Sequence, residues 1–405
     1  MFFVSLSLPP LVADAPYTSK EALVLSAAKH VMMAQKQREL FNWKKEFAYI
    51  DRVAEKEKHQ SMFTFVADYA QNMYLPSFQG AQPGETYYYS PVNAYCFGVV
   101  DASFRPSQLN AHIYLEDVGR KGGDNVASML WKQLQLKGLI PEDNTKPATA
   151  AKELNLIFDN CGGQNKNNMV LRMLVFLVKR GIAKVARAIF LVRGHTKNDC
   201  DRMFNQMKKL YRNKNIYHLE GLMSAVGVHQ DVNPVEVSEF YDFDRVQDVY
   251  MKRIKDVTKS HIFEVDSADS NSMFLREYDG APAVKQLLVK KQYQAQTDWL
   301  DEALKKLFGK TKARVGLQEI KWIELHDKWR KLVPAEERSF YYIKTDPGQE
   351  IRAKVKKHTG EAKKQRKERS RTGVGKKDEV QEPEDNTTFG GKQPVASVPN
   401  TPQKI

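Results

Sequence analysis

Two short apolar segments each end at an aspartate, and this pattern constrains the fold more than any other feature of the sequence. MFTFVA (residues 62–67) precedes Asp68, and ELNLIF (residues 153–158) precedes Asp159. Short runs of this kind, bounded by polar residues, are typical of strands buried inside a sheet. A strand carries a side chain rigidly to the edge of the sheet, where neighbouring strand ends converge. We therefore expect a sheet with carboxylates at one edge.

Other segments indicate further elements around these two strands. Strand-like runs lie at 86–89, 94–100, 109–115 and 186–192, and helical patterns lie at 20–58, 124–137, 169–179 and 199–211. The first runs suggest an antiparallel meander, and the later strands alternate with helices. This is the element order of an α/β, RNase H-like domain, in which parallel strands extend an antiparallel meander and helices flank the mixed sheet.

The order of elements divides the chain into four regions. We expect a helical lead-in at 1–60, the RNase H-like domain at 61–217, an α-rich accessory subdomain at 218–345 and a disordered basic tail at 346–405. No membrane anchor is expected, because the apolar run at 169–178 is interrupted by Arg172 and is too short to span a bilayer.

Positive charge is concentrated in two segments of this chain, whose net charge is +14. Residues 159–217 hold thirteen Lys and Arg against three Asp, and residues 352–377 hold twelve against two Glu. The first segment contains apolar runs and must fold, whereas the second has almost none and is expected to be disordered. This charge predicts a polyanionic partner, DNA. The run KKQRKERSR predicts nuclear localisation, although a merely solvated tail explains it equally well.

Three aspartates form the candidate catalytic and metal-binding site: Asp68, Asp159 and, near the start of a helix, Asp201. Carboxylates held together need a cation, and their hard oxygen atoms suit Mg²⁺ or Mn²⁺. Two such ions about 4 Å apart would activate a water molecule and stabilise the leaving oxygen of a phosphodiester. The alternative for each position is a turn residue or a helix N-cap.

An amide-rich turn, NCGGQNKNN, follows Asp159 and leads into a helix. Its glycines allow close approach of the backbone, and the helix N-terminus attracts anions. Residues expected to support the carboxylates are Asn160, Gln164, Asn165, His195 and Asp199. His195 has four interpretations: a phosphate contact, a metal ligand, a proton shuttle or a structural residue of its loop. The turn lacks a phosphate-loop motif, and no small-molecule cofactor is expected.

Three stretches resemble a family of uncharacterised, transposon-derived domains with an RNase H-like, DDE-type transposase or integrase fold. They are FVADYAQNMYLPSFQGAQPGETYY, LNLIFDNCGGQNKNNMVLRMLVFLVKRG and FLVRGHTKNDCDRMFNQMKKLYR. The D-N-x-x-G-Q-N-K-N turn and the G-H-T-x-N-x-x-D block carry the resemblance, which covers about residues 20–345. It implies that Asp68, Asp159 and Asp201 bind the metal. Asp199 is the nearest rival for the third position, and Glu220 is a distant one.

The expected function is that of a transposase-derived, metal-dependent nuclease or polynucleotidyl transferase that acts on DNA phosphodiesters. The basic residues expected to contact DNA are Lys166, Arg172, Arg193, Lys197, Arg202, Lys208 and Lys209. The alternative is a domesticated, catalytically inactive DNA-binding or scaffold protein. The absence of a recognisable upstream DNA-binding region, which many family members carry, favours this alternative, whereas the intact acids and the amide-rich turn count against it. A homo-oligomer is left open.

Overall fold

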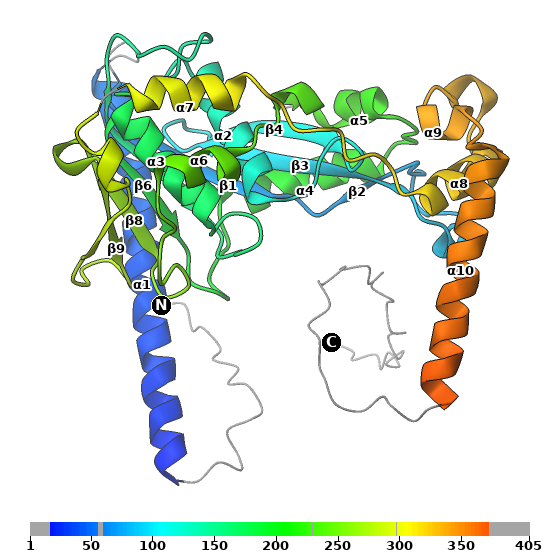
Figure 1. The fold of residues 1–405 in the computed structure, drawn as a ribbon, viewed down its shortest axis with the longest axis horizontal. Coiled ribbons are helices and arrows are strands. Elements are labelled where there is room, and N and C mark those ends of the chain that lie inside the picture. Colours follow the sequence, from blue (N-terminus) through cyan, green and yellow to red (C-terminus); the bar gives the residue numbers. More distant parts are fainter. Residues whose placement is uncertain (1–16, 56–59, 229, 297, 372–405) are drawn as a thin grey trace, which may run out of the picture. The chain divides into compact units, whose positions relative to one another are not determined.

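The computed structural model describes residues 17–55, 60–228, 230–296 and 298–371 (Figure 1). Its strands are β1 (Met62–Tyr69), β2 (Met73–Leu75), β3 (Val92–Asp101), β4 (Gln108–Leu115), β5 (Ala151–Phe158), β6 (Ala183–Phe190), β7 (Asp231–Pro234), β8 (Ile262–Asp266), β9 (Ser272–Arg276) and β10 (Val284–Leu287). Within these ranges they form one ten-stranded sheet with the order β10-β9-β8-β6-β5-β1-β3-β4-β7, and β2 pairs with β3. The predicted mixed α/β fold is confirmed.

The helices lie before, between and after these strands. They are α1 (Tyr17–Ala54), α2 (Gly123–Leu136), α3 (Asn168–Lys179), α4 (Asp199–Arg212), α5 (Leu219–Val226), α6 (Phe243–Tyr250), α7 (Trp299–Phe308), α8 (Glu319–Asp327), α9 (Tyr341–Lys344) and α10 (Gly348–Arg371). Over the described residues, each helix lacks an apolar stretch long enough to cross a bilayer.

The central strands are buried on both faces. In β1, Phe65 and Ala67 join a core formed with α2, α3, α6 and α7, whereas Val66 joins a second core formed with α1, α4, α5, α8 and α9. This alternation follows from the two-residue period of a strand. It also explains why β1 reads in the sequence as a continuous apolar run.

The region 218–345 differs from the expected α-rich accessory subdomain. β7 pairs in parallel with β4, and β8 pairs antiparallel with β6, so the region extends the same sheet at both edges. Residues as far as Arg352 form one compact unit. The sequence signal was weak because β7, β8 and β10 are short and lie between segments of mixed polarity.

The run at 86–89, predicted to be a strand, lies largely in the 3₁₀ helix η2 (Gly84–Tyr88). Both the backbone N–H and the hydroxyl of Thr86 donate to the carbonyl of Pro83, at 2.9 and 2.7 Å. Tyr87 and Tyr88 are exposed. The aromatic residues favour a strand, but the run has no continuous face to bury, so local turn hydrogen bonds determine its structure.

The disorder predicted from residue 346 is wrong for the segment Gly348–Arg371, which forms α10. A scarcity of apolar residues prevents a core, but Lys, Arg, Glu, Gln and Ala all have high helix propensity. Arg352 anchors the start of α10 through ion pairs with Asp327 and Asp346. The predicted tail after residue 371 lies outside the described residues.

A close contact between β3 and α4 yields a first prediction. A Cβ atom at Gly98 of β3 would come within 2.6 Å of the Phe204 ring of α4. We expect Gly98→Ala to lower the free energy of unfolding by about 1–3 kcal/mol, because the added methyl group displaces the ring. Urea denaturation followed by circular dichroism measures this change. In the control Gly84→Ala, the new Cβ meets nothing within 4 Å, and equal effects in both variants would contradict the contact.

Candidate functional site

Asp68 lies near the end of β1, and Asp159 directly follows the neighbouring strand β5. β1 and β5 pair in parallel with Ala67 opposite Phe158, so the next residues on the two strands are these two aspartates. By strand alternation, Asp68 shares the face of Val66, on which α4 packs. The register of one strand pair therefore brings two of the three predicted acids together.

The carboxyl group of Asp68 is held by two donors. Its Oδ1 accepts from the backbone N–H of Tyr69 at 2.7 Å, and its Oδ2 accepts from Nδ2 of Asn198 at 3.2 Å. Burial, followed by the negative charge of Asp159, raises the pKa of Asp68 to about 7 despite these bonds. Near neutral pH, this carboxyl group is therefore close to half protonated.

Asp159 is held by the amide-rich turn that follows it. Its Oδ1 accepts from Nδ2 of Asn165 at 2.6 Å and from the backbone N–H of Cys161 at 3.3 Å. Burial raises the pKa of Asp159, and the charge of Asp201 adds to this shift while the two hydrogen bonds oppose it. Asn165 is fully buried, so its amide fixes the orientation of the carboxylate.

Asp201 lies in the first turn of α4, where its side chain is part of a capping box with Asn198. Oδ2 of Asp201 accepts from the backbone N–H of Asn198 at 2.9 Å, and Oδ1 of Asn198 accepts from the N–H of Cys200 at 2.8 Å. Because the amide nitrogen of Asn198 donates to Asp68, this residue links β1 to α4. The sequence analysis assigned no role to Asn198, although its N-x-x-D spacing before a helix is a capping signal.

The three acids fit a divalent cation only in part. Across the described ranges, His, Cys, Asp and Glu side chains do not form a group of three or more placed to hold one metal ion. Asp68 and Asp159 suit such an ion, because their hard oxygen donors share one strand edge and burial opposes their ionisation. Asp201 is coupled to both through its charge, but one of its oxygens caps α4.

Lys121 is a positive group near Asp68 that sequence reasoning also missed. Its Nζ donates to the carbonyl of Ala70 at 3.2 Å and lies 4.8 Å from the ring centroid of Tyr69. Burial lowers the pKa of Lys121 to about 8, and the negative charge of Asp68 opposes this shift. Lys121 lies in the loop between β4 and α2, and only the folded sheet brings it to the acids.

Two predicted supporting residues contact α1 instead of the carboxylates. Asp199 forms an ion pair with Lys45. The carbonyl of His195 accepts from Arg38 at 2.7 Å, and its ring centroid lies 5.3 Å from that of His30. These contacts favour structural roles for both residues, and they leave Asp201 as the acid of α4 that is coupled to Asp68 and Asp159.

Two residues of the amide-rich turn bond to groups other than the acids within the described part of the chain. Nδ2 of Asn160 lies 3.2 Å from Nε2 of His261, and the backbone carbonyl of Gln164 accepts from Asn167 at 2.8 Å. Asn160 therefore ties the turn to the loop before β8, while Gln164 stabilises the turn internally.

Two of the basic residues expected to contact DNA are buried, which corrects that expectation. Arg172 is 0% exposed and forms ion pairs with Asp244 and Asp248 of α6 at 2.8 and 2.6 Å. Lys166 is 6% exposed, and burial lowers its pKa to about 8. A charged residue within an apolar run, as Arg172 is, does not indicate a surface position when the helix, like α3, is buried around most of its circumference.

The other basic residues lie at or near the surface around α4. Arg193 is exposed, and Lys208 donates to Oε1 of Gln71 at 2.7 Å. A pocket of about 590 Å³ is lined by Lys197, Asn198, Asp201, Arg202, Asn205, Gln206 and Lys209. The third acid and the capping asparagine thus border a surface rich in cations and amides.

Comparison with known proteins shows a similarity to an uncharacterised family over part of the chain. The family model described as "Domain of unknown function (DUF7869)" matches residues 139–281. This range includes Asp159 and Asp201 and excludes Asp68. No curated protein and no solved structure matches the chain.

The raised pKa of Asp68 predicts a pH-dependent stability. A carboxyl group whose pKa is higher in the folded state than in the unfolded state favours folding when it is protonated. For Asp68, this contribution to the free energy of unfolding is lost as pH rises from about 4 through about 7. We expect Asp68→Asn to stabilise the metal-free protein at pH 8 by about 1–2 kcal/mol and to have little effect at pH 4. Chemical denaturation at both pH values in EDTA measures the difference. Asp231→Asn, at an exposed position of β7, is the control, and destabilisation by Asp68→Asn at pH 8 would contradict the prediction.

Proposed function

We propose that the protein is a metal-dependent nuclease or polynucleotidyl transferase that acts on DNA, with Asp68, Asp159 and Asp201 as its metal ligands. The observation that carries the proposal is the adjacent placement of Asp68 and Asp159 on parallel strands, with both pKa values raised. Burying two carboxylates together is costly unless a cation neutralises them. Perturbed pairs of this kind are concentrated at functional sites.

The strand order supports an RNase H-like fold of the transposase or integrase type. β1, β3 and β4 form an antiparallel meander, and β5 and β6 extend it in parallel from β1. Asp68 then lies on β1, Asp159 directly follows β5, and Asp201 lies in α4, the helix that follows β6. This arrangement agrees with the family that the sequence resembles.

Each group of residues at the site would have a separate role. Asn165 and Asn198 orient the carboxylates of Asp159 and Asp68, and Lys121 offsets negative charge nearby. When bound, Mg²⁺ or Mn²⁺ would supply activation of the attacking water or 3′-hydroxyl and stabilisation of the leaving oxygen. The cations of α4 would hold the phosphate backbone, without reading its sequence.

Plasmid nicking tests the proposed chemistry. We expect the protein to nick supercoiled DNA with Mg²⁺ or Mn²⁺ but not in EDTA, and Asp159→Asn to lower the rate at least about 100-fold, because the substitution removes a metal ligand. Electrophoresis of the nicked circle measures the rate. Nicking that is absent, or that persists in Asp159→Asn, would refute the catalytic role.

The same assay identifies the third acid. We expect Asp201→Asn to lose activity as Asp159→Asn does. Asp199→Asn, matched in chemistry and two residues away, is expected to retain activity because Asp199 pairs with Lys45 of α1. Thermal unfolding of both variants controls for damage to the fold. Selective loss in Asp199→Asn would reverse the assignment.

The basic surface of α4 predicts the salt dependence of DNA binding. We expect combined alanine substitutions at Lys197, Arg202 and Lys209 to weaken binding and to reduce the slope of log K against log salt by about two to three. Fluorescence anisotropy with a labelled duplex at several salt concentrations measures the slope. A control with the same loss of charge substitutes Lys152, Lys184 and Lys305, which are exposed elsewhere. Equal effects in the two triple variants would assign DNA binding to net charge alone.

A catalytically inactive DNA-binding or scaffold protein is the second candidate. It is favoured by one observation: Asp201 is exposed and uses its carboxylate as a helix cap, so the described residues contain no assembled three-ligand group. Titration calorimetry with Mn²⁺ separates the candidates. Heat that disappears in Asp159→Asn supports the nuclease, whereas absence of metal binding together with retained DNA binding supports the inactive protein.

A further inference from the structure

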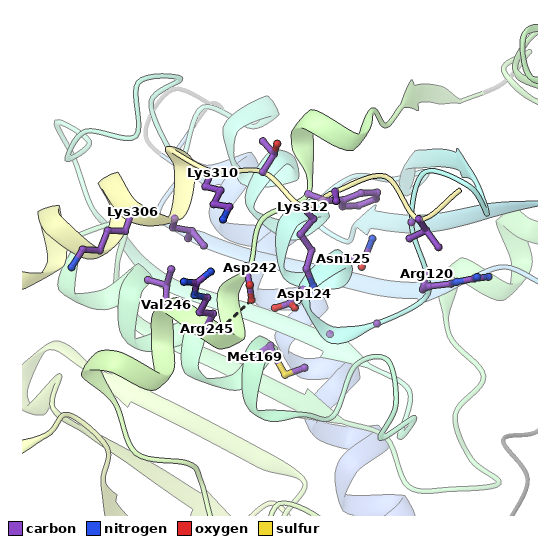
Figure 2. A pocket seen from close by; sticks show the side chains of 18 of the residues that line it. Arg120, Asp124, Asn125, Met169, Asp242, Arg245, Val246, Lys306, Lys310 and Lys312 are labelled. Atoms are coloured by element: carbon purple, nitrogen blue, oxygen red, sulfur yellow. Dashed lines mark hydrogen bonds and ion pairs between the residues drawn. The ribbon is translucent and has the colours of Figure 1, made fainter. Parts of the chain in front are cut away.

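A second pocket, of about 730 Å³, lies between the loop that follows β4, the start of α2, α6, and the segment after α7 (Figure 2). None of the three aspartates lines it. The first residue of α2, Gly123, packs against the side chain of Asn167 at the N-cap of α3. This volume is typical of pockets for small organic ligands.

The charged residues of this pocket favour an anion. Five basic side chains line it against two acidic ones, namely Arg120, Arg245, Lys306, Lys310 and Lys312 against Asp124 and Asp242. Lys312 pairs with Asp124 and Lys306 pairs with Glu302. In the described parts of the chain, Lys310 and Arg245 have no acidic partner. Figure 2 shows Lys310 on the segment after α7, and Arg245 of α6 beside Asp242.

The remaining wall of the pocket is largely apolar. It is formed by Val118, Met169, Phe240, Val246, Val249, Tyr250, Leu307, Ala313 and Val315. An inorganic anion would leave this surface in contact with water. Basic side chains next to an apolar wall therefore favour a ligand that carries an organic group beside its negative charge.

Asn125 provides the third observation. Its side chain lines the pocket and is 7% exposed, yet its amide has no hydrogen-bond partner among the described residues. Its Nδ2 lies against Gly119, where a Cβ atom would come within 2.5 Å. Because this amide lines the pocket without a partner in the chain, a ligand with donor and acceptor groups can bond to both of its polar atoms.

We propose that this pocket binds a nucleoside phosphate. Lys310 and Arg245 hold the phosphate, and the first turn of α2, whose N-cap Gly122 provides no side-chain cap, adds backbone N–H donors. The amide of Asn125 contacts the edge of the base, since an amide can donate and accept at once. The apolar wall covers the rest of the base. The nucleotide is either free or the 5′-terminal unit of a strand.

Binding is tested in EDTA with the full chain, so that the carboxylate site does not contribute. Titration calorimetry compares four nucleoside 5′-monophosphates, the free nucleosides, inorganic phosphate, and an oligodeoxynucleotide with or without a 5′-phosphate. We expect a nucleoside phosphate to bind at least about tenfold more tightly than either the nucleoside or inorganic phosphate, because both halves of the pocket are then filled. Tight binding of only the 5′-phosphorylated strand assigns the strand end as the source.

Variants separate this site from general electrostatics. We expect Lys310→Ala and Arg245→Ala each to weaken binding about tenfold, and Asn125→Ala to weaken it and to reduce discrimination among the bases. Lys305→Ala, on the exposed side of α7 and outside the pocket, is the matched control. Thermal unfolding verifies that each variant is folded.

Three results would overturn the proposal: no binding of any phosphate ester, equal affinity for inorganic phosphate, or equal weakening in Lys305→Ala. The outcome is independent of the nuclease proposal. Asp159→Asn is expected to abolish nicking and to leave nucleotide binding in EDTA unchanged.

Discussion

The parallel pairing of β1 with β5 is the constraint on which the candidate site depends. A shift of one residue in β1 would turn Asp68 toward the opposite face of the sheet, away from α4. Such a shift would also exchange the positions of Phe65 and Val66, which fill different cores. The large apolar area on both faces therefore fixes the register, and the register in turn forces Asp68 and Asp159 together. The electrostatic cost at the strand ends is offset by packing elsewhere in the sheet.

The stability of α4 and the geometry of the acids depend on the same residue. Asn198 caps the helix through its amide oxygen and holds Asp68 through its amide nitrogen. Asp201 completes the cap, so a shift of its carboxylate toward Asp68 and Asp159 would release the N–H of Asn198. A cation at the acids would then compete with a helix cap, whose loss costs about 1 kcal/mol. The binding energy of the ion must exceed this cost before three ligands can assemble.

The sequence predicted the elements that contain a continuous buried apolar stretch. β1 and β5 are apolar runs because both of their faces are covered, and each run ends at the residue that leaves the core. It did not predict η2, where Thr86 bonds locally, or β8 and β10, which are too short for a periodic pattern. Lys121 and Asn198 were missed for another reason. Lys121 interacts with the charge of Asp68 across 53 positions, and Asn198 bonds to Asp68 across 130. Such interactions exist only once the sheet and α4 are assembled.

The charged residues show the same difference: a local sequence pattern gives the charge of a residue, but only the folded chain determines its partners. Arg172 carries a positive charge in the sequence, but two acids of α6 neutralise it in the interior. Arg187 likewise pairs with Glu153 and Glu264 within the sheet. Cations remain available to a ligand where they form no ion pair, as for Lys310 among the described residues of the pocket beside α2. A count of Lys and Arg therefore predicts that a polyanion is attracted, whereas the pairing of each cation in the folded chain determines where it binds.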